Sequence, residues 1–443
     1  MNGNLTAGDL ELLRKDFAAN PAFRIAQNAV TKVSVDDITI DREIVTGTGH
    51  ALSTMLDDWK VTNQEVSGRC WLFAGLNLLR VGAMRKMGLK EFEFSQNWAM
   101  FWDKIERANY FLEAVIETAG RDLDDRTVAH LLESAAEDGG QWNMFVALIA
   151  KHGLVPKSVM PETYSSSHTG RMNSILRNLL HQGAQSLRAT AARSADAAQA
   201  EKADILKVIY RVLCIHLGTP PERFEWQWTD SDHEFHRDGE LTPLEFAARY
   251  ADLPLDEYVC LVHDPRPSSP AGRTFTVQYL GNVLGAPPVI YLNVEMPLLK
   301  EIAAKALQGG EPVWFGCDVS QNMSNEYGIW DAKLYDLAAL YDTPFTLDKA
   351  ERLAYHETQM THAMLFTGVD VADDGSTRRW RVENSWGTDR GKDGFYTMND
   401  SWFDEYVFEI AARRSALPAA LQEALAAEPI VLPAWDPMGA LAR

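Results

Sequence analysis

The two halves of the chain carry different hydrophobic patterns, and this division limits the fold more than any single motif does. The first half has helical periodicity. Its clearest amphipathic stretch starts near Cys70, repeats apolar residues at intervals of three and four, and stops at Gly88. From Val289 onward, short β-rich runs such as VIYLNV, PVWFGCDV and AMLFTGVDV take over. A run of helices followed by a run of strands predicts an α+β fold.

Composition places the chain among globular proteins. Of its 443 residues, 46% are hydrophobic and 23% are charged, and a chain of this length has room for two to three domains of about 150 residues. The 42 basic and 62 acidic residues leave a net charge of −20. Because this charge repels phosphate backbones and anionic lipid, we expect neither a nucleic-acid nor a membrane partner; cationic groups such as peptide amino termini are favoured.

The N-terminus and the cysteines bear on location. The N-terminus lacks the apolar core of a signal peptide, and no apolar run approaches the roughly 18 residues of a membrane span. The spacing of the few cysteines matches no metal or redox motif, and sparse cysteine fits a reducing compartment. We therefore predict a cytoplasmic protein. The cysteines are Cys70, Cys214, Cys260 and Cys317.

Shifts in pattern divide the chain into five segments. The predicted segments are an N-terminal segment (1–60), a helical domain (61–165), a mostly helical insertion (166–285), a β-rich domain (286–416) and a C-terminal helix and arm (417–443). Within them we expect strands at 33–40 and 224–228 and a helix at 417–428. Three prolines prevent the first part of 429–443 from being helical.

The sequence around Cys70 is typical of a reactive thiol. In NQEVSGRCW, Gly68 indicates a turn and Ser67 a helix cap, so Cys70 is expected at the start of the following helix. The helix dipole lowers the pKa of a thiol there, but its contribution of at most about 2 kcal/mol is too small, and a histidinium partner is needed for the rest. The alternative is a small buried hydrophobic residue, the interpretation adopted for the other three cysteines.

His362 is the candidate partner because of one predicted hairpin. MTHAMLFTGVDV runs into a turn at 373–375, and TRRWRVENSWG runs back. Pairing about this turn places His362 opposite residues 384–388, so the Asn384 amide is expected to hold the imidazole in one orientation and tautomer. Trp386 is expected to cover that hydrogen bond from water. Taken alone, His362 would be interpreted as a core histidine.

Two further groups are weaker candidates. His233 and His236 form an HxxH pair, but without a third ligand we interpret them as part of a solvated loop and predict no metal site. Gly139 and Gly140 precede a helical stretch. They form either a simple turn or a glycine edge that lets a substrate backbone approach closely.

Four spaced blocks resemble papain-like cysteine peptidases, and more closely the bleomycin hydrolase and aminopeptidase C branch. Gln64 and Cys70 are six residues apart, like the oxyanion glutamine and the nucleophile of papain-like enzymes, and Trp71 follows the cysteine. THA (361–363) and NSWG (384–387) match the histidine and asparagine blocks, in the family's order. SGRCW, EDGGQW, EPVWFGCDV and the ending LPAWDPMGALAR point to the branch.

The resemblance implies a papain-like fold with a large, mostly helical insertion and a C-terminal arm in the active-site cleft. It also implies a cytosolic thiol aminopeptidase that acts on peptides with a free N-terminus, hydrolyses an amide of bleomycin, needs no metal or organic cofactor and forms a homohexameric ring. Cys70 would be the nucleophile, His362 the acid and base, Asn384 its orienting group and Gln64 an oxyanion donor.

The expected substrate-binding residues lie in two places. Gly139 and Gly140 belong to the glycine-rich segment, and Ala442 and Arg443 end the arm. Self-trimming of Arg443 would leave a carboxylate at Ala442 to pair with the substrate's ammonium group. Two alternatives stay open: a Cys-His-Asn acyl transferase or small-amide amidase, and an inactive peptide-binding protein on a papain scaffold.

Overall fold

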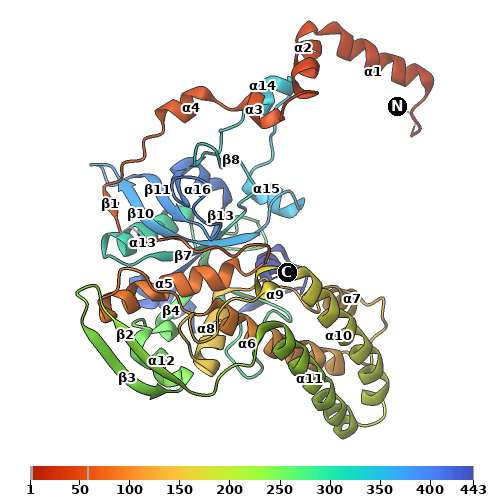
Figure 1. Cartoon of the computed structure of the whole chain (residues 1–443). Coiled ribbons are helices and arrows are strands. Elements are labelled where there is room, and N and C mark those ends of the chain that lie inside the picture. Colours follow the sequence, from red (N-terminus) through yellow and green to blue (C-terminus); the bar gives the residue numbers. More distant parts are fainter. Residues whose placement is uncertain (1–2, 57–58, 443) are drawn as a thin grey trace.

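The computed structural model describes residues 3–56 and 59–442, which form an α+β fold around one large sheet (Figure 1). The strands are β1 (Thr54–Met55), β2 (Phe224–Thr229), β3 (Phe235–Leu241), β4 (Tyr258–Val262), β5 (Thr274–Val277), β6 (Tyr291–Asn293), β7 (Val313–Cys317), β8 (Met323–Ser324), β9 (Ile329–Trp330), β10 (His362–Val371), β11 (Thr377–Glu383), β12 (Phe395–Asn399), β13 (Val407–Arg413) and β14 (Ile430–Leu432). Across the sheet they follow the order β14-β5-β6-β4-β13-β7-β10-β11-β12-β9-β8, with β1 paired to β10. β2 and β3 form a separate hairpin.

Helices cover both faces of this sheet. They are α1 (Ala7–Ala19), α2 (Pro21–Val30), α3 (Val35–Thr39), α4 (Arg42–Gly47), α5 (Cys70–Met87), α6 (Gln96–Glu117), α7 (Arg126–Glu133), α8 (Trp142–His152), α9 (Tyr164–Ser167), α10 (Gly170–Ala191), α11 (Ala195–Leu217), α12 (Pro243–Tyr250), α13 (Met296–Gln308), α14 (Leu337–Tyr341), α15 (Lys349–Ala354), α16 (Asp400–Tyr406) and α17 (Ala419–Ala424). None of these helices, taken over the described residues, is long and apolar enough to cross a bilayer.

The central strands alternate between two buried cores. Trp314 and Leu365 face the core that contains α5, α6 and α8, whereas Phe315 and Phe366 face the core that contains α13 and α16. This period of two is that of strands whose two faces are both covered. The predicted α+β class is confirmed, and α5 crosses the sheet beside β10 and β7.

The segment 166–285 contains more than helices. α10 and α11 pack on each other and on α6, and Figure 1 shows this pair extending from the body. The strand predicted at 224–228 is confirmed as β2, and β2 pairs with β3. β4 and β5 also fall in this segment but belong to the large sheet, so the sheet begins before the predicted boundary at residue 285.

The N-terminal segment differs from the prediction in one place. The strand expected at 33–40 is wrong, because Ser34 caps a short helix, α3, by accepting a hydrogen bond from the Asp36 N–H at 3.3 Å. The local cap outweighs the alternating pattern. α1 and α2 bury no side chain in the described residues, and they project away from the body in Figure 1.

The C-terminal arm, residues 429–442, returns to the helical side of the sheet. The helix expected at 417–428 is found as the shorter α17. β14 then pairs in parallel with β5, and a 3-10 helix at Pro437–Ala442 is buried along its whole length. The non-helical start predicted for the arm is thus confirmed.

Candidate active site

Cys70 is the first residue of α5, as predicted, and the loop before it is shaped by Gly68. A Cβ on Gly68 would lie 2.8 Å from the Asp138 Cβ, and the Gly68 N–H donates to Asp138 Oδ2 at 3.2 Å. The predicted Ser67 cap is wrong: Arg69 is the N-cap residue, and the Ser67 hydroxyl donates instead to a backbone carbonyl three residues upstream at 2.6 Å. The helix therefore begins without a side-chain cap, so first-turn N–H groups remain for an anion.

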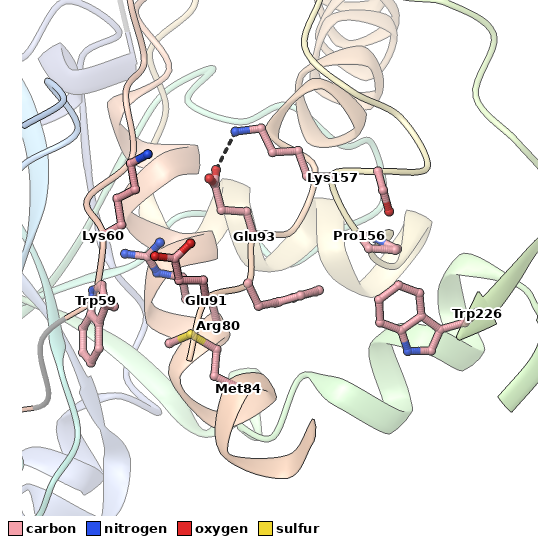
Figure 2. A pocket seen from close by; sticks show the side chains of 11 residues that line it. Trp59, Lys60, Arg80, Met84, Glu91, Glu93, Pro156, Lys157 and Trp226 are labelled. Atoms are coloured by element: carbon pink, nitrogen blue, oxygen red, sulfur yellow. Dashed lines mark hydrogen bonds and ion pairs between the residues drawn. The ribbon is translucent and has the colours of Figure 1, made fainter. Parts of the chain in front are cut away.

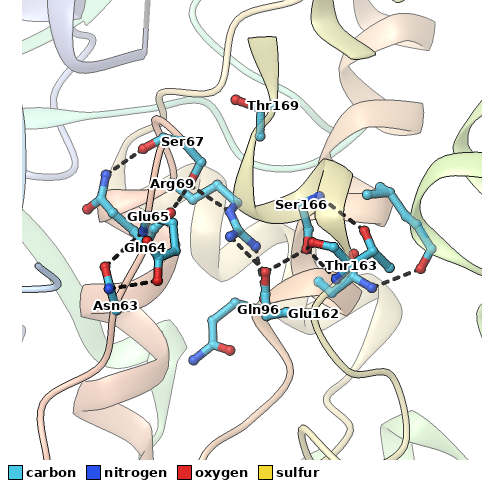
Figure 3. Close-up of polar contacts among 12 residues, drawn as sticks. Asn63, Gln64, Glu65, Ser67, Arg69, Gln96, Glu162, Thr163, Ser166 and Thr169 are labelled. Atoms are coloured by element: carbon cyan, nitrogen blue, oxygen red, sulfur yellow. Dashed lines mark hydrogen bonds and ion pairs between the residues drawn. The ribbon is translucent and has the colours of Figure 1, made fainter. Parts of the chain in front are cut away.

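An ion pair with the half-buried Glu162 fixes the buried side chain of Arg69, the residue before the candidate nucleophile (Figure 3). Its guanidinium donates to both carboxylate oxygens of Glu162, at 3.0 and 2.8 Å, and its Nε donates to Ser67 Oγ at 3.0 Å. The Ser166 hydroxyl donates to the same carboxylate at 2.6 Å. Such a two-pronged pair restricts orientation as well as distance. The backbone that carries Cys70 is therefore held to the 162–166 segment.

Asp138 joins the nucleophile loop to the insertion. Its carboxylate accepts hydrogen bonds from Lys104 Nζ at 2.6 Å, Thr169 Oγ1 at 2.5 Å and Asn173 Nδ2 at 2.8 Å, and its carbonyl accepts from Trp71 Nε1 at 2.7 Å. Burial raises the pKa of Asp138, but the Lys104 ammonium and these hydrogen bonds outweigh it and hold the pKa well below its usual range. Asp138 is thus a fixed anion with its oxygens already satisfied.

His362 and Asn384 meet at the open end of the predicted hairpin. β10 and β11 pair antiparallel, and His362 Nε2 lies 2.9 Å from Asn384 Oδ1. The Ser385 N–H also donates to this Oδ1, at 2.8 Å, which fixes the orientation of the amide. Because Oδ1 only accepts, Nε2 carries the proton and Nδ1 is left as the acceptor. The Trp386 ring lies against the imidazole, 5.1 Å between centroids, where it was expected.

The thiol and the imidazole are both buried and held neutral. Burial raises the pKa of the Cys70 thiol to about 11, against hydrogen bonds from the N–H groups of Ala363, Trp71 and Cys70 itself. Burial also lowers the pKa of His362 to about 4, and the hydrogen bond to Asn384 offsets only part of this. The expectation of a lowered thiol pKa is therefore wrong for this buried state. Desolvation penalises both charged forms more than the helix start stabilises the anion.

Gln64 is tied to the asparagine loop. The Ser385 hydroxyl donates to Gln64 Oε1 at 2.6 Å, and the Gln64 N–H donates to the Ser385 carbonyl at 2.8 Å. The amide nitrogen Nε2 donates to the Ser67 carbonyl at 2.5 Å. Since Oε1 is occupied by a donor, Nε2 is fixed as the donor end, and its second N–H is available to another acceptor.

Gly139 and Gly140 lie directly beside the nucleophile helix. A Cβ on Gly140 would lie 2.4 Å from the Trp71 ring, so packing alone requires a glycine there. The Gly139 carbonyl accepts a hydrogen bond from Arg107 Nη2 at 2.5 Å. A role for these two glycines in substrate binding stays a prediction.

The end of the arm reaches the same place. Arg107 Nη1 donates to the Ala442 carbonyl at 3.3 Å, so one guanidinium links Ala442 to Gly139. Asp103 holds Arg107 from the preceding turn of α6, at 3.3 Å. A cavity of about 60 Å³ borders Arg107 and Ala442. Arg443, also predicted to bind substrate, lies outside the described residues.

The other sequence candidates lie elsewhere. His236 Nε2 lies 2.8 Å from Asp230 Oδ2, and His233 is exposed. Among residues 3–56 and 59–442, no three His, Cys, Asp or Glu side chains are grouped as metal ligands would be. A pocket of about 290 Å³ beside the second half of α5 has Trp59 and Trp226 on opposite sides, with Arg80 near Trp59 (Figure 2), and none of the predicted site residues lines it.

Sequence reasoning missed the residues that hold the site together. Asp138 stands directly before Gly139 in EDGGQW, so its place in the motif was a usable signal. Glu162 and Arg107 carry no such signal, because Arg69 lies 93 residues from Glu162, and the Gly139 and Ala442 carbonyls lie 32 and 335 residues from Arg107. Only the folded chain brings these groups together.

Comparisons with known proteins agree with this geometry. The Peptidase C1-like family matches residues 4–439. The chain is 41% identical to an aminopeptidase C of Listeria monocytogenes over 442 residues, covering 100% of both chains. It is 40% identical to the bleomycin hydrolase of Homo sapiens, covering 100% of this chain and 99% of that one. The crystal structure of PepW from Lactobacillus rhamnosis HN001 superposes with a TM-score of 0.97 at 42% identity, covering 99% of each chain.

The fold and the Cys-His-Asn site thus define a papain-like cysteine peptidase. The chain belongs to the Peptidase C1-like family. The predicted family and the predicted papain-like fold are both confirmed.

Proposed function

We propose that this chain is a thiol aminopeptidase that removes residues from the free N-terminus of peptides through an acyl-enzyme on Cys70. The observation that carries the mechanism is the 2.9 Å contact between His362 Nε2 and Asn384 Oδ1. This contact leaves Nδ1 of His362 free to accept a proton. The next residue of the same strand is Ala363, and its N–H donates a hydrogen bond to the Cys70 thiol. Full-length likeness to enzymes named aminopeptidase C and bleomycin hydrolase supports this activity.

The proposed reaction follows from the neutral pair. The Cys70 thiol gives its proton to His362 Nδ1 as sulfur attacks the first peptide carbonyl, so that neither charge forms alone in the buried site. The oxyanion is stabilised by the Cys70 N–H at the start of α5 and by the free N–H of Gln64 Nε2. His362 then protonates the leaving amine as the C–N bond breaks. Water, deprotonated by His362, hydrolyses the thioester and returns the thiol.

Four substitutions test these roles. Cys70→Ala should abolish turnover and leave the fold intact, because alanine fits the small volume at the helix start. Gln64→Ala should lower kcat by about 10²–10³-fold, the usual cost of one oxyanion donor. Asn384→Ala should cost less than His362→Ala, since Asn384 only orients the imidazole. Residual turnover in Cys70→Ala beyond a trace would refute the assignment of the nucleophile.

The arm supplies the restriction to free N-termini in this proposal. The buried segment Pro437–Ala442 ends beside Gly139, held by Arg107. Trimming of the last residue would leave a carboxylate at Ala442, which would pair with the substrate's ammonium group and block longer N-terminal extensions. An aminoacyl arylamide compared with its N-blocked form tests this: a clear preference for the free amine is expected. Bleomycin-type amide hydrolysis belongs to the same proposal and rests on the names of the relatives.

We also propose a homohexamer that works in the cytoplasm. Apolar side chains on the exposed helices α1 and α2, including Leu12 and Ile25, are available for contact with another copy. The four cysteines are free thiols, in keeping with a reducing compartment. Sedimentation at micromolar concentration tests the assembly, and a monomer would contradict it.

Transfer of the acyl group to added amines, in place of hydrolysis of amino-acid arylamides, would indicate the acyl transferase, and hydrolysis of small amides without turnover of these arylamides would indicate the amidase. Failure of Cys70 to react with a thiol-directed epoxide would indicate the inactive scaffold.

A further inference from the structure

Glu409 on β13 is a buried carboxylic acid that the fold does not explain. None of its surface is exposed, and neither carboxylate oxygen has a hydrogen-bond partner within the described residues. Burial raises the pKa of Glu409 to about 8 and outweighs the opposing interaction with the neighbouring Cys260 thiol, which donates its hydrogen bond to Asn143 Oδ1 at 2.9 Å. A buried carboxyl group without a partner lowers stability. Such a group is expected where function needs it.

Strand register places Glu409 on the face of the sheet that carries the active site. Gly316 of β7 pairs with Ala363 of β10 on one side and with Glu409 on the other. Directly paired residues of antiparallel strands project to the same face. The Ala363 N–H bonds the Cys70 thiol. Because neighbouring strands lie about 4.8 Å apart, the backbone of Glu409 is about 10 Å from that of Ala363.

The sheet surface between these two residues is made by small side chains. Gly316 has none, and Ala363 has only a methyl group. The side chain of Met360 fills the space: a Cβ on Gly316 would lie 2.3 Å from Met360 Sδ and 3.6 Å from the Glu409 Cβ. Methionine is unbranched and adapts its shape readily. The flexible thioether of Met360 thus covers Gly316, the residue that lies between Glu409 and Ala363 in the sheet.

The arm docks over the same part of the sheet. The Tyr291 hydroxyl donates to the Met438 carbonyl of the arm at 3.1 Å. Burial and the nearby Glu409 carboxylate raise the pKa of Tyr291. Glu409 therefore lies where the arm closes the site, and no Lys, Arg or His within residues 3–56 and 59–442 lowers its pKa.

We propose that Glu409 is a substrate-binding residue that provides a negative charge for the free α-ammonium group of the substrate. This inference rests on the proposed aminopeptidase function. The ammonium group is bonded to the carbon next to the carbonyl that Cys70 attacks, so it enters beside the thiol, over Ala363 and Gly316. Met360 moves aside, Glu409 releases its proton to water as the ammonium group arrives, and the carboxylate and the ammonium group form an ion pair away from bulk water, where such pairs are strong. Glu409 acts in addition to the end of the arm.

Glu409→Gln in the full chain tests the inference, because it removes the charge and keeps the size. The substrates are a nitrophenyl ester of an amino acid and its desamino counterpart with the same side chain. We expect kcat/KM for the amino ester to fall about 10- to 100-fold, the range for a hydrogen bond to a charged group. The desamino ester should change by less than about twofold. The Tm should rise or stay the same, since a desolvated acid has been removed.

Glu106→Gln is the matched control. Glu106 is also buried, but it is paired with Lys151 at 2.6 Å and His152 at 2.8 Å. Its substitution should lower the Tm and leave the ratio of the two esters unchanged. If Glu409→Gln does not fold, Glu409→Met, which fills the site with an apolar chain, should show the same selective loss.

The outcomes separate the two proposals. If the wild-type enzyme releases N-terminal residues but the Glu409 variant has an unchanged ratio of the two esters, the assignment of Glu409 is overturned and the proposed function stands. Equal losses on both esters, or a lower Tm with no change in the ratio, would give Glu409 a structural role and also overturn it. A wild-type enzyme that releases no N-terminal residue overturns the proposed function, and the assignment of Glu409 fails with it.

Discussion

The two ends of the chain contrast in how they are held. The N-terminal helices α1 and α2 are regular and well capped: Thr6 and Asp9 form a reciprocal capping box, and Asn20 caps α2. Yet they bury no side chain in the described residues. The C-terminal segment Pro437–Ala442 is a short 3-10 helix, and all of it is buried. Local capping thus determines regular structure, whereas tertiary contacts determine whether a segment is fixed to the body.

Polar anchors as well as apolar burial hold the arm. Arg266 forms an ion pair with Asp436 at 3.0 Å, and Arg266 is itself paired with Asp264 at 2.7 Å. β14 adds a parallel strand to the edge of the sheet. By contrast, 66% of Leu12 in α1 is exposed. The arm is built into the fold, whereas the N-terminal helices offer their apolar side chains to another surface.

The largest expected effect comes from deleting the arm. Removal of residues 438–443 takes the buried side chains of Met438 and Leu441 out of the core. At about 1.5–3 kcal/mol for each, the free energy of unfolding should fall by about 3–6 kcal/mol. Cleavage of free-amine substrates should weaken, and N-blocked substrates should become accessible. Thermal unfolding and a matched pair of arylamides measure the two effects.

Deletion of residues 1–33 is the matched control for the arm. It removes a longer segment, but one in which no side chain of residues 3–33 is buried, so small-arylamide kinetics should stay unchanged. An unchanged ratio of free-amine to N-blocked cleavage after the arm deletion would show that the arm does not select substrates. Loss of activity in the N-terminal deletion would remove the contrast between the two ends.

A second prediction concerns pH and the buried site beside the arm. The pKa of His362 is lowered to about 4, from about 6.5 for an unfolded histidine. As the pH falls, His362 is therefore protonated in the unfolded chain at a higher pH than in the folded chain. The stability that neutral His362 supports is present above pH 6.5 and is lost as pH falls from 6.5 to 4, by about 3 kcal/mol. Between pH 7 and 4, the wild type should lose that much more than His362→Gln in chemical denaturation.

His233 is the control histidine for this experiment, because it is exposed. The pH profile of His233→Gln should follow that of the wild type. Parallel profiles for the wild type and His362→Gln would mean that the imidazole is not desolvated as the structure has it.

The third prediction targets the link between the arm and the glycine segment. Arg107→Lys keeps the charge next to Asp103 but loses the fork that donates to both Gly139 and Ala442. We expect the preference for free-amine over N-blocked arylamides to fall about tenfold, roughly what the loss of one hydrogen bond to a charged group costs. Arg177→Lys, at a half-exposed pair with Glu137, should leave the preference unchanged. An equal effect of both substitutions would argue against a positioning role for Arg107.

The contrast between the two ends also shows how far sequence carries. The start of α5, the hairpin and the contact between His362 and Asn384 were predictable, because they depend on a turn, a helix start and local pairing. The strand at 33–40 was wrong because the Ser34 cap outweighed the alternating pattern. The neutral state of Cys70 and His362 could not be predicted, since desolvation depends on packing from distant segments. For the same reason, Arg107 and Glu409 carried no signal in the sequence.

The smallest expected effect is on the fold itself when α1 is changed. Phe17 and Leu12 are exposed on this helix, so Phe17→Asp and Leu12→Asp should change the free energy of unfolding by no more than about 0.5 kcal/mol, the range for surface positions. Turnover of a small arylamide should also stay the same. If the exposed apolar side chains contact another copy, the same substitutions should shift the protein to smaller assemblies in sedimentation. Arg14→Asp adds a negative charge to the same helix without removing an apolar side chain, so it should shift the assembly less. If Phe17→Asp and Leu12→Asp both leave the assembly intact, α1 does not mediate association. If either substitution clearly lowers the Tm, α1 packs against the rest of its own chain in solution.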